Sequence, residues 1–280
     1  MNGPWSLDEL RSRIRDPQRR ERYPGGSPNP SEVAAYAAAV PPDATSQTAV
    51  VLGMTPELRA MALTRFRRVV TIESNRTAIE LYRAWVDETD RHRETIMQGN
   101  WFDASQLLSE PVSAVVGDGI FCTLDNLEEY RRLLRSTASI LRPRGHLIVR
   151  KLLIPDGFRP EAYRPDILIQ RFRRGELDEA EFGLSMRMVG HYACCYDPTT
   201  YLLDNKKLFT ECARDVQSGL LTEREHHLIR RYRFSGKNSM IPQPLWEALL
   251  TECGFAFTEQ TLRGKNWYVY YKVYACSLHT

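Results

Sequence analysis

Residues 48–76, TAVVLGMTPELRAMALTRFRRVVTIESNR, decide the fold. An apolar run rich in β-branched residues ends at Gly53, and a second one, residues 67–72, ends at Glu73. The segment between them predicts a helix, because Thr55 can act as an N-cap and Pro56 suits a first helical turn, where no N–H is needed. The stretch therefore predicts a strand, a turn, a helix and a second strand.

The ends of this unit predict a site for a nucleoside joined to an anionic group, although any parallel α/β domain contains such a unit. The helix N-terminus beside Gly53 offers backbone donors and a positive dipole end to an anion. Glu73 can accept hydrogen bonds from both hydroxyls of a ribose. Gly53 is the only glycine between Leu52 and Glu73. The G-x-G-x-x-G turn on which a pyrophosphate lies is therefore absent.

Three more strands are predicted, at residues 95–98, 111–116 and 146–152. The first of them runs into Asn100-Trp101, and the second runs into Gly117-Asp118-Gly119. Trp101 either belongs to the core or lies against an adenine ring, with Asn100 bonding a ring-edge nitrogen. The glycines around Asp118 favour close approach of a ligand, because glycine contributes nothing to a core.

The alternation of strands and helices predicts an α/β fold with a doubly wound parallel sheet. Ligands of such sheets lie outside the carboxyl ends of the strands, where Gly53, Glu73, Asn100 and Asp118 all fall. A last helix and two final strands then close the sheet with an antiparallel pair. The expected architecture is a Rossmann-like, mostly parallel sheet of seven strands, made of the five parallel strands and the final antiparallel pair.

The chain divides into four expected parts. They are an N-terminal helical cap (1–42), a cofactor-binding core (43–154), a helical lid inserted between the fifth and sixth strands (155–242), and a C-terminal helix with a β-hairpin (243–280). Long insertions over strand ends are usually functional. The lid is therefore expected to bind the acceptor, with His191 as a candidate base and Tyr192, Tyr196 and Tyr201 as an aromatic lining or as the lid's own core.

Composition excludes several classes of protein. The 280 residues are 42% apolar and carry a net charge of +3, which is too small to indicate nucleic acid. The six cysteines lack C-x-x-C spacing, so we expect reduced thiols, no metal site and a cytoplasmic protein. No apolar run is long enough for a membrane span. The arginine-rich segment 6–22 is interleaved with acids, which favours a solvated helix over an RNA-binding one.

Together these motifs resemble the class I S-adenosylmethionine-dependent methyltransferases. VVLGMTPEL (50–58) stands where that family has its glycine-rich motif, and VVTIES (69–74) carries its ribose-binding acid. Asn100-Trp101 matches the adenine-contacting motif, and VVGDGIF (115–121) matches the fourth motif. The LGxTPEL, GNW and GDG combination is similar to a bacterial subgroup of the family.

The resemblance implies methyl transfer from S-adenosylmethionine to a small-molecule or peptide acceptor, with bacterial secondary metabolism as an expected setting. Nucleic acid is not expected as the acceptor, because the N/D-P-P-Y/F/W run of base-amine methyltransferases is missing after the fourth strand. The resemblance also implies one set of cofactor-binding residues: Gly53, Met54, Thr55, Glu73, Ser74, Asn100, Trp101, Asp118 and Gly119.

Two other functions remain open on the sequence. One is a nucleotide-fold module that binds S-adenosylmethionine without catalysis. The other is an NAD-dependent oxidoreductase, which fits the distance from Gly53 to Glu73 but not the missing glycines or the closing hairpin.

Overall fold

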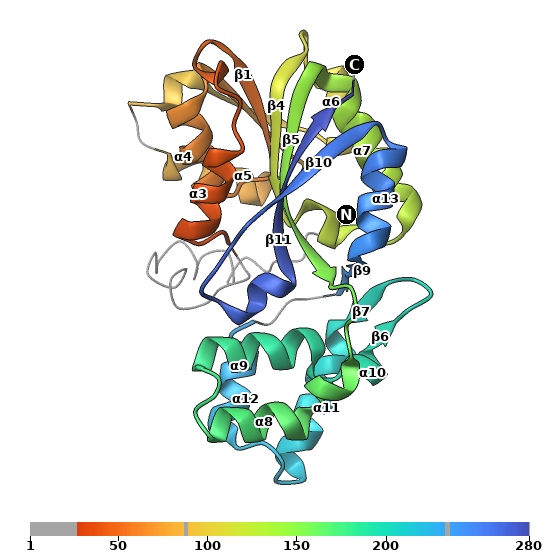
Figure 1. The fold of residues 1–280 in the computed structure, drawn as a ribbon. Coiled ribbons are helices and arrows are strands. Elements are labelled where there is room, and N and C mark those ends of the chain that lie inside the picture. The colour runs from red at the N-terminus through yellow and green to blue at the C-terminus, as the bar shows by residue number, and fades with distance from the viewer. Residues whose placement is uncertain (1–26, 87–88, 233–235, 280) are drawn as a thin grey trace.

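The computed structural model describes residues 27–86, 89–232 and 236–279 of the chain. The segment 6–22 and most of the expected N-terminal cap lie outside these residues. The predicted α/β architecture is confirmed, because a mostly parallel sheet carries helices on both faces (Figure 1).

The central sheet has the order β10-β11-β5-β4-β1-β2-β3. Its first five strands along the chain are parallel: β1 (Thr48–Leu52), β2 (Arg68–Glu73), β3 (Glu94–Gln98), β4 (Val112–Asp118) and β5 (Leu141–Ile154). β10 (Phe255–Gln260) and β11 (Tyr271–Leu278) form the predicted antiparallel pair. The short strand β9 (Ile241–Pro242) adds to the end of β5.

The register of the parallel strands brings the predicted site residues to one edge. Leu52 at the end of β1 pairs with Ile72 on one side and with Gly117 on the other. Gly53, Glu73 and Asp118 come directly after these partners, so all three lie at the carboxyl edge of neighbouring strands. This is the edge at which ligands of open α/β sheets bind.

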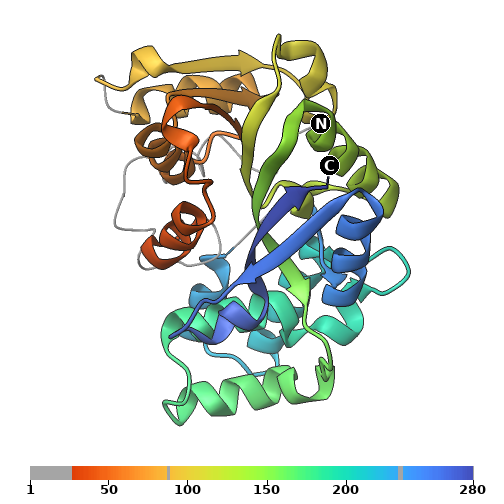
Figure 2. The same cartoon turned by 45° about the horizontal axis from the view of Figure 1, so that its top comes forward.

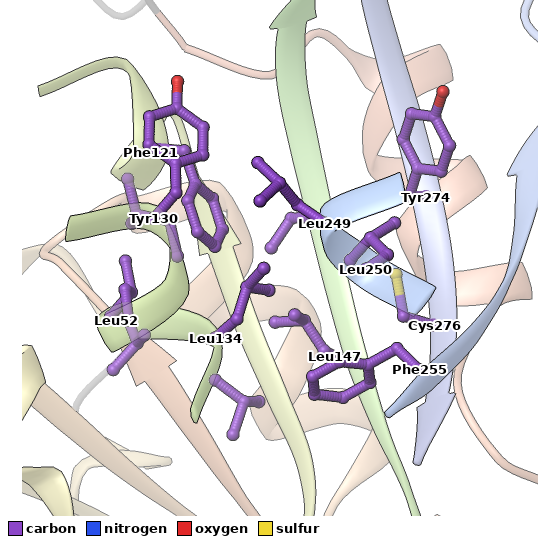
Figure 3. Close-up of a cluster of buried hydrophobic side chains, with 14 of the residues drawn as sticks. Leu52, Phe121, Tyr130, Leu134, Leu147, Leu249, Leu250, Phe255, Tyr274 and Cys276 are labelled. Atoms are coloured by element: carbon purple, nitrogen blue, oxygen red, sulfur yellow. The ribbon is translucent and has the colours of Figure 1, made fainter. Parts of the chain in front are cut away.

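Helices cover the two faces of the sheet. On one face lie α3 (Pro30–Ala38) and α4 (Pro56–Arg65), and α5 (Arg76–Tyr82) follows β2. On the other face lie α6 (Ala104–Leu107), α7 (Leu127–Ile140) and α13 (Gln243–Glu252). Successive residues of each strand face opposite sides of the sheet. Val50 and Leu52 therefore belong to the hydrophobic cluster on one face, and Ala49 and Val51 belong to the cluster on the other. Figure 3 shows part of the cluster between the sheet, α7 and α13, with Leu52, Tyr130 and Leu249.

Residues 155–242 form the segment beyond the carboxyl end of β5, as Figures 1 and 2 both show. Its helices are α8 (Pro165–Arg173), α9 (Glu179–Ser185), α10 (Tyr192–Cys195), α11 (Asn205–Gln217) and α12 (Glu223–Arg230). It also contains a three-stranded sheet that the sequence did not predict, formed by β6 (Tyr196–Asp197), β7 (Leu202–Asp204) and β8 (Lys237–Ser239). The segment has a hydrophobic cluster of its own.

Local signals at the helix ends were partly wrong. Thr55 stands at the N-cap position of α4, but its side chain makes no capping hydrogen bond. Asn29 caps α3 with a reciprocal bond to Glu32. Thr222 and Glu225 form the same kind of capping box at the start of α12 (Glu223–Arg230).

Candidate active site

Three predicted site residues come together at the ends of β1 and β2. A Cβ atom placed on Gly53 would lie 3.7 Å from Cζ2 of Trp101 and 3.9 Å from Oε2 of Glu73. Gly53 has a φ of +92°, a conformation that side chains other than glycine rarely adopt. The absence of a side chain at this position therefore leaves the space between an acid and an aromatic ring to a ligand.

The hydrogen bonds that the Glu73 carboxylate accepts from described residues are on one oxygen, Oε1. Oε1 accepts hydrogen bonds from the Asn75 N–H at 2.7 Å and the Ser74 hydroxyl at 3.4 Å. Oε2 is the oxygen nearest to Gly53. Burial raises the pKa of Glu73, against the opposing effect of the Asn75 and Ser74 bonds. A hydrogen-bond donor on a ligand would stabilise the buried carboxylate. Oε2 is the oxygen placed to accept that hydrogen bond.

Hydrogen bonds to the backbone hold Trp101 and Asn100 in place. Trp101 donates from Nε1 to the Ile72 carbonyl at 2.9 Å, which fixes its ring against the end of β2. Asn100 uses its Oδ1 to cap the following turn at the Phe102 N–H, 3.1 Å away. That oxygen is therefore occupied locally, and the side-chain NH₂ is the part of Asn100 suited to a ring nitrogen. Met54 is buried against Ala78 and Tyr82.

The two glycines that flank Asp118 have structural reasons that the sequence did not reveal. A Cβ on Gly117 would lie 2.7 Å from Cδ1 of Ile120, so the next turn of chain explains this glycine by packing. Gly119 has a φ of +63°, and a Cβ there would meet nothing within 4 Å. The turn geometry thus accounts for both glycines without a ligand.

Asp118 is held by a partner that the sequence analysis missed. Its carboxylate accepts two hydrogen bonds from Arg150 of β5, at 2.7 and 3.1 Å. Nη1 of the same guanidinium donates to Oε2 of Glu32 on α3 at 2.8 Å. Burial opposes the charge of Arg150, but Asp118 and Glu32 raise its pKa well above the ordinary value. The three charged groups form a buried cluster at the carboxyl end of β4, beside the part of β5 that pairs with it.

Helix α3 is tied to this cluster by a tyrosine. The Tyr36 hydroxyl donates to the Gly117 carbonyl at 2.7 Å and accepts from the Arg150 N–H at 2.6 Å. Burial and the neighbouring Asp118 raise the Tyr36 pKa well above its usual value, so the phenol stays neutral. Asn29, at the start of α3, donates to the Tyr268 hydroxyl at 2.9 Å. The helix therefore has side-chain contacts near both of its termini, to β4 and β5 through Tyr36 and to the turn before β11 through Asn29.

Among the predicted lid residues, His191, Tyr192 and Tyr196 have side-chain partners within residues 155–242. Nε2 of His191 lies 2.9 Å from Oδ2 of Asp215 on α11. Tyr192 and Tyr196 stack with ring centroids 4.4 Å apart, and the Tyr196 hydroxyl donates to the Met240 carbonyl. Tyr201, at a φ of +60°, packs against the lid cluster and the main core alike. These contacts agree with the interpretation that the tyrosines form the lid's own core.

A second buried cation on β5 was also missed. Lys151 is fully buried and donates to the Tyr130 hydroxyl at 2.7 Å and to the Ser239 carbonyl at 3.4 Å. Burial lowers its pKa to about 8, with Cys122 acting in the opposite direction. The signal for Arg150 and Lys151 was present in the sequence, since LIVRKLLI (147–154) places two charges inside an apolar strand.

The described residues contain neither a candidate metal site nor a candidate membrane span. No group of three or more His, Cys, Asp or Glu in residues 27–86, 89–232 and 236–279 is arranged to hold a metal ion. No helix in that part of the chain is long and apolar enough to cross a bilayer.

Comparison with known proteins gives the class of fold. No family model and no curated protein sequence matches the chain. Among solved structures, the methyltransferase CcbJ from Streptomyces caelestis is similar with a TM-score of 0.55 and 14% identity, over 93% of this chain and 94% of that one. An O-methyltransferase family protein from Burkholderia thailandensis is similar with a TM-score of 0.50 and 14% identity. The similarity covers 98% of this chain and 60% of the Burkholderia protein.

A third similar structure is not called a methyltransferase. It is described as a putative Zn-dependent alcohol dehydrogenase from Rhodobacter sphaeroides, with a TM-score of 0.52, 16% identity, and coverage of 97% of this chain and 98% of that one. Identities this low establish the fold alone. The fold is the Rossmann-like, mostly parallel sheet shared with solved methyltransferases.

Proposed function

We propose that the protein transfers a methyl group from S-adenosylmethionine to a small-molecule or peptide acceptor, in bacterial secondary metabolism. The observation that carries the proposal is the position of Glu73, Gly53 and Trp101 around one space at the carboxyl ends of β1 and β2. An acid, a missing side chain and an aromatic ring in this arrangement suit the ribose and adenine of a nucleoside.

The residues fit the cofactor in three places. Glu73 presents Oε2 to the ribose hydroxyls, and Ser74 supports it through Oε1. The Trp101 ring and the Asn100 amide are suited to the adenine. Met54 and Thr55 lead into α4, whose first N–H groups are not capped by the Thr55 side chain and can bind the methionine carboxylate. When bound, S-adenosylmethionine supplies an electrophilic methyl group on a sulfonium.

The chain's own part in such a reaction is to bind, orient and exclude water. α3 and the lid lie on either side of the carboxyl edge, where they can enclose the acceptor (Figures 1 and 2). His191 remains our candidate for a base in the lid, with Asp215 orienting its ring. Tyr192, Tyr196 and Tyr201 remain candidates for the acceptor lining.

Calorimetry with the purified protein tests the proposal. We expect S-adenosylhomocysteine to bind and NAD⁺ not to bind. NAD⁺ binding without S-adenosylhomocysteine binding would favour the oxidoreductase instead. S-adenosylhomocysteine binding with no methyl transfer from S-adenosylmethionine to a broad panel of alcohols, amines and peptides would favour a non-catalytic module.

A further inference from the structure

Two consecutive cysteines of the lid hold their sulfur atoms close together. Sγ of Cys194 lies 3.5 Å from Sγ of Cys195, at the end of the short helix α10. All six cysteines of the chain are among the described residues and are free thiols, and among those residues this is the one pair of sulfur atoms in contact. A single free cysteine packs as a small apolar residue. Two cysteines in sulfur contact can also react with each other.

The two thiols have different surroundings. Cys194 is exposed, whereas Cys195 is 4% exposed and belongs to the hydrophobic cluster of the lid. Burial raises the pKa of Cys195, and the contact with Cys194 adds to this effect against the opposing charge of Lys207. In this arrangement the exposed thiol meets an oxidant from the solvent, and the buried thiol beside it is placed to resolve the product.

Their adjacency in the sequence makes a disulfide between them easy to reverse. Neighbouring Cα atoms lie about 3.8 Å apart across a trans peptide, whereas the cysteines of an ordinary disulfide have Cα atoms about 4.4–6.8 Å apart. A bond between Cys194 and Cys195 therefore requires a change of the backbone, and this strain makes the bond more easily reduced. Such a bond suits a modification that is made and removed again, and not a permanent cross-link.

The backbone of this pair also holds the predicted lid residues. The N–H groups of Cys194 and Cys195 donate to the His191 carbonyl at 3.2 and 2.9 Å, and the Cys194 thiol donates to the same oxygen at 3.4 Å. Tyr196 follows directly, and its ring stacks on that of Tyr192. A change of the backbone at the two cysteines therefore alters the turn that begins at His191 and moves Tyr196 relative to Tyr192.

We propose that Cys194 and Cys195 form an oxidation site for hydroperoxides, which closes to a disulfide and rearranges the turn from His191 to Tyr196. The site does not depend on the proposed function, because it rests on the sulfur contact and on the exposure of Cys194. A link between this modification and methyl transfer does rest on that function, since it requires the lid to bind the acceptor.

The reaction has two steps, written here for hydrogen peroxide. The Cys194 thiolate attacks a peroxide oxygen, so that an S–O bond forms, the O–O bond breaks, and hydroxide leaves and is protonated to water. The Cys195 sulfur then attacks the sulfur of this sulfenic acid: the S–S bond forms, the S–O bond breaks, and the oxygen leaves as water with the Cys195 proton. The two thiols lose two electrons, and hydrogen peroxide is reduced to two molecules of water.

The geometry favours the second step. The 3.5 Å contact is close to the separation of reacting atoms in a near-attack arrangement. Cys195 therefore needs no access to solvent of its own, and its proximity to Cys194 offsets the proton that burial makes it retain.

Peptide mapping by mass spectrometry, after one equivalent of hydrogen peroxide, tests the site. Dimedone, which traps sulfenic acids, is added to half of each sample. The wild-type protein should lose two hydrogen atoms from the peptide that contains both cysteines, and dithiothreitol should restore them. Cys195→Ser should stop after the first step, with about tenfold more dimedone on Cys194 than in the wild type. Cys194→Ser should show neither product.

Cys212→Ser is the matched control. Cys212 is another buried cysteine of the lid cluster, where burial raises its pKa to about 12 and Cys194 acts in the same direction. This variant should react as the wild type does. A disulfide between Cys194 and Cys212 would overturn the proposal, and so would a sulfenic acid that persists on Cys194 in the wild type.

Near-ultraviolet circular dichroism of the same samples tests the rearrangement. The oxidised wild type should show a changed tyrosine signal that dithiothreitol restores, and Cys194→Ser should show no change after the same treatment. A disulfide that leaves this signal unchanged would contradict the rearrangement of the turn. Neither measurement uses the cofactor, so failure of S-adenosylhomocysteine to bind would refute the proposed function and leave the oxidation site standing.

Discussion

Asp118 and Arg150 are register partners on β4 and β5, and their side chains are joined by two hydrogen bonds of 2.7 and 3.1 Å. The two side chains are 7% and 3% exposed, so the pair is buried at the edge where ligands are expected. Glu32 binds the same guanidinium from α3. The pair thus joins the sheet to the helix that covers its edge, which makes Asp118 structural as well as a candidate binding residue.

Asp118→Asn should therefore lower stability. Breaking a buried ion pair from one side costs about 3–5 kcal/mol. We expect the low end of this range, because Arg150 keeps its ion pair with Glu32. Urea unfolding measures the change, and we also expect at least a tenfold loss of ligand binding or turnover. Wild-type stability in this variant would contradict the importance of the pair.

Glu73→Gln should change stability and binding in opposite directions. Because burial raises the pKa of Glu73 in the folded state, its ionisation lowers stability as the pH rises above the unfolded value. The variant should thus have a higher Tm than the wild type at pH 7 and the same Tm below the ordinary carboxyl pKa. S-adenosylhomocysteine binding should weaken by about 1.5–3 kcal/mol, the range for a hydrogen bond to a charged group. Unchanged affinity by calorimetry would remove Glu73 from the ribose site.

Lys151→Met should flatten the rise of stability with pH above about 8, the pKa to which burial lowers this lysine. Between that value and the unfolded pKa of about 10.4, the unfolded state binds more protons, so the contribution of Lys151 to stability increases with pH. The difference between wild type and variant in unfolding free energy should shift by about 2 kcal/mol from pH 7.5 to pH 10. A constant difference across this range would show that Lys151 has an ordinary pKa.

His191→Ala and Tyr196→Phe test the role of the lid. Both side chains bond within residues 155–242, to Asp215 and to Met240. We expect each variant to lower acceptor turnover much more than S-adenosylmethionine affinity, because the hydrogen bonds of both residues are to partners in the lid. Product formation is measured beside calorimetric binding once an acceptor is found. Equal loss of turnover and cofactor affinity would place the lid in the cofactor site.

Much of the sheet could be predicted from the sequence, because its signals are local. Apolar runs that end at glycine or an acid mark β1, β2 and β4, and the intervening helical periodicity requires parallel strands. The small β6-β7-β8 sheet could not be predicted in this way. Its strands have at most three residues, too few to show a period.

The sequence by itself determined the alternation of strands and helices and the place of Gly53, Glu73 and Asp118 at strand ends, since strands that alternate with helices are parallel and end at one edge of the sheet. Only the tertiary structure decided what these residues contact. In the folded chain the Trp101 ring lies beside Gly53, and Asp118 pairs with Arg150. Glu32 binds the same arginine from a helix 118 residues away along the chain. The physical reason is that a buried charge needs a partner close to it in space. Which side chain that is depends on tertiary packing, and residue spacing along the chain does not predict it.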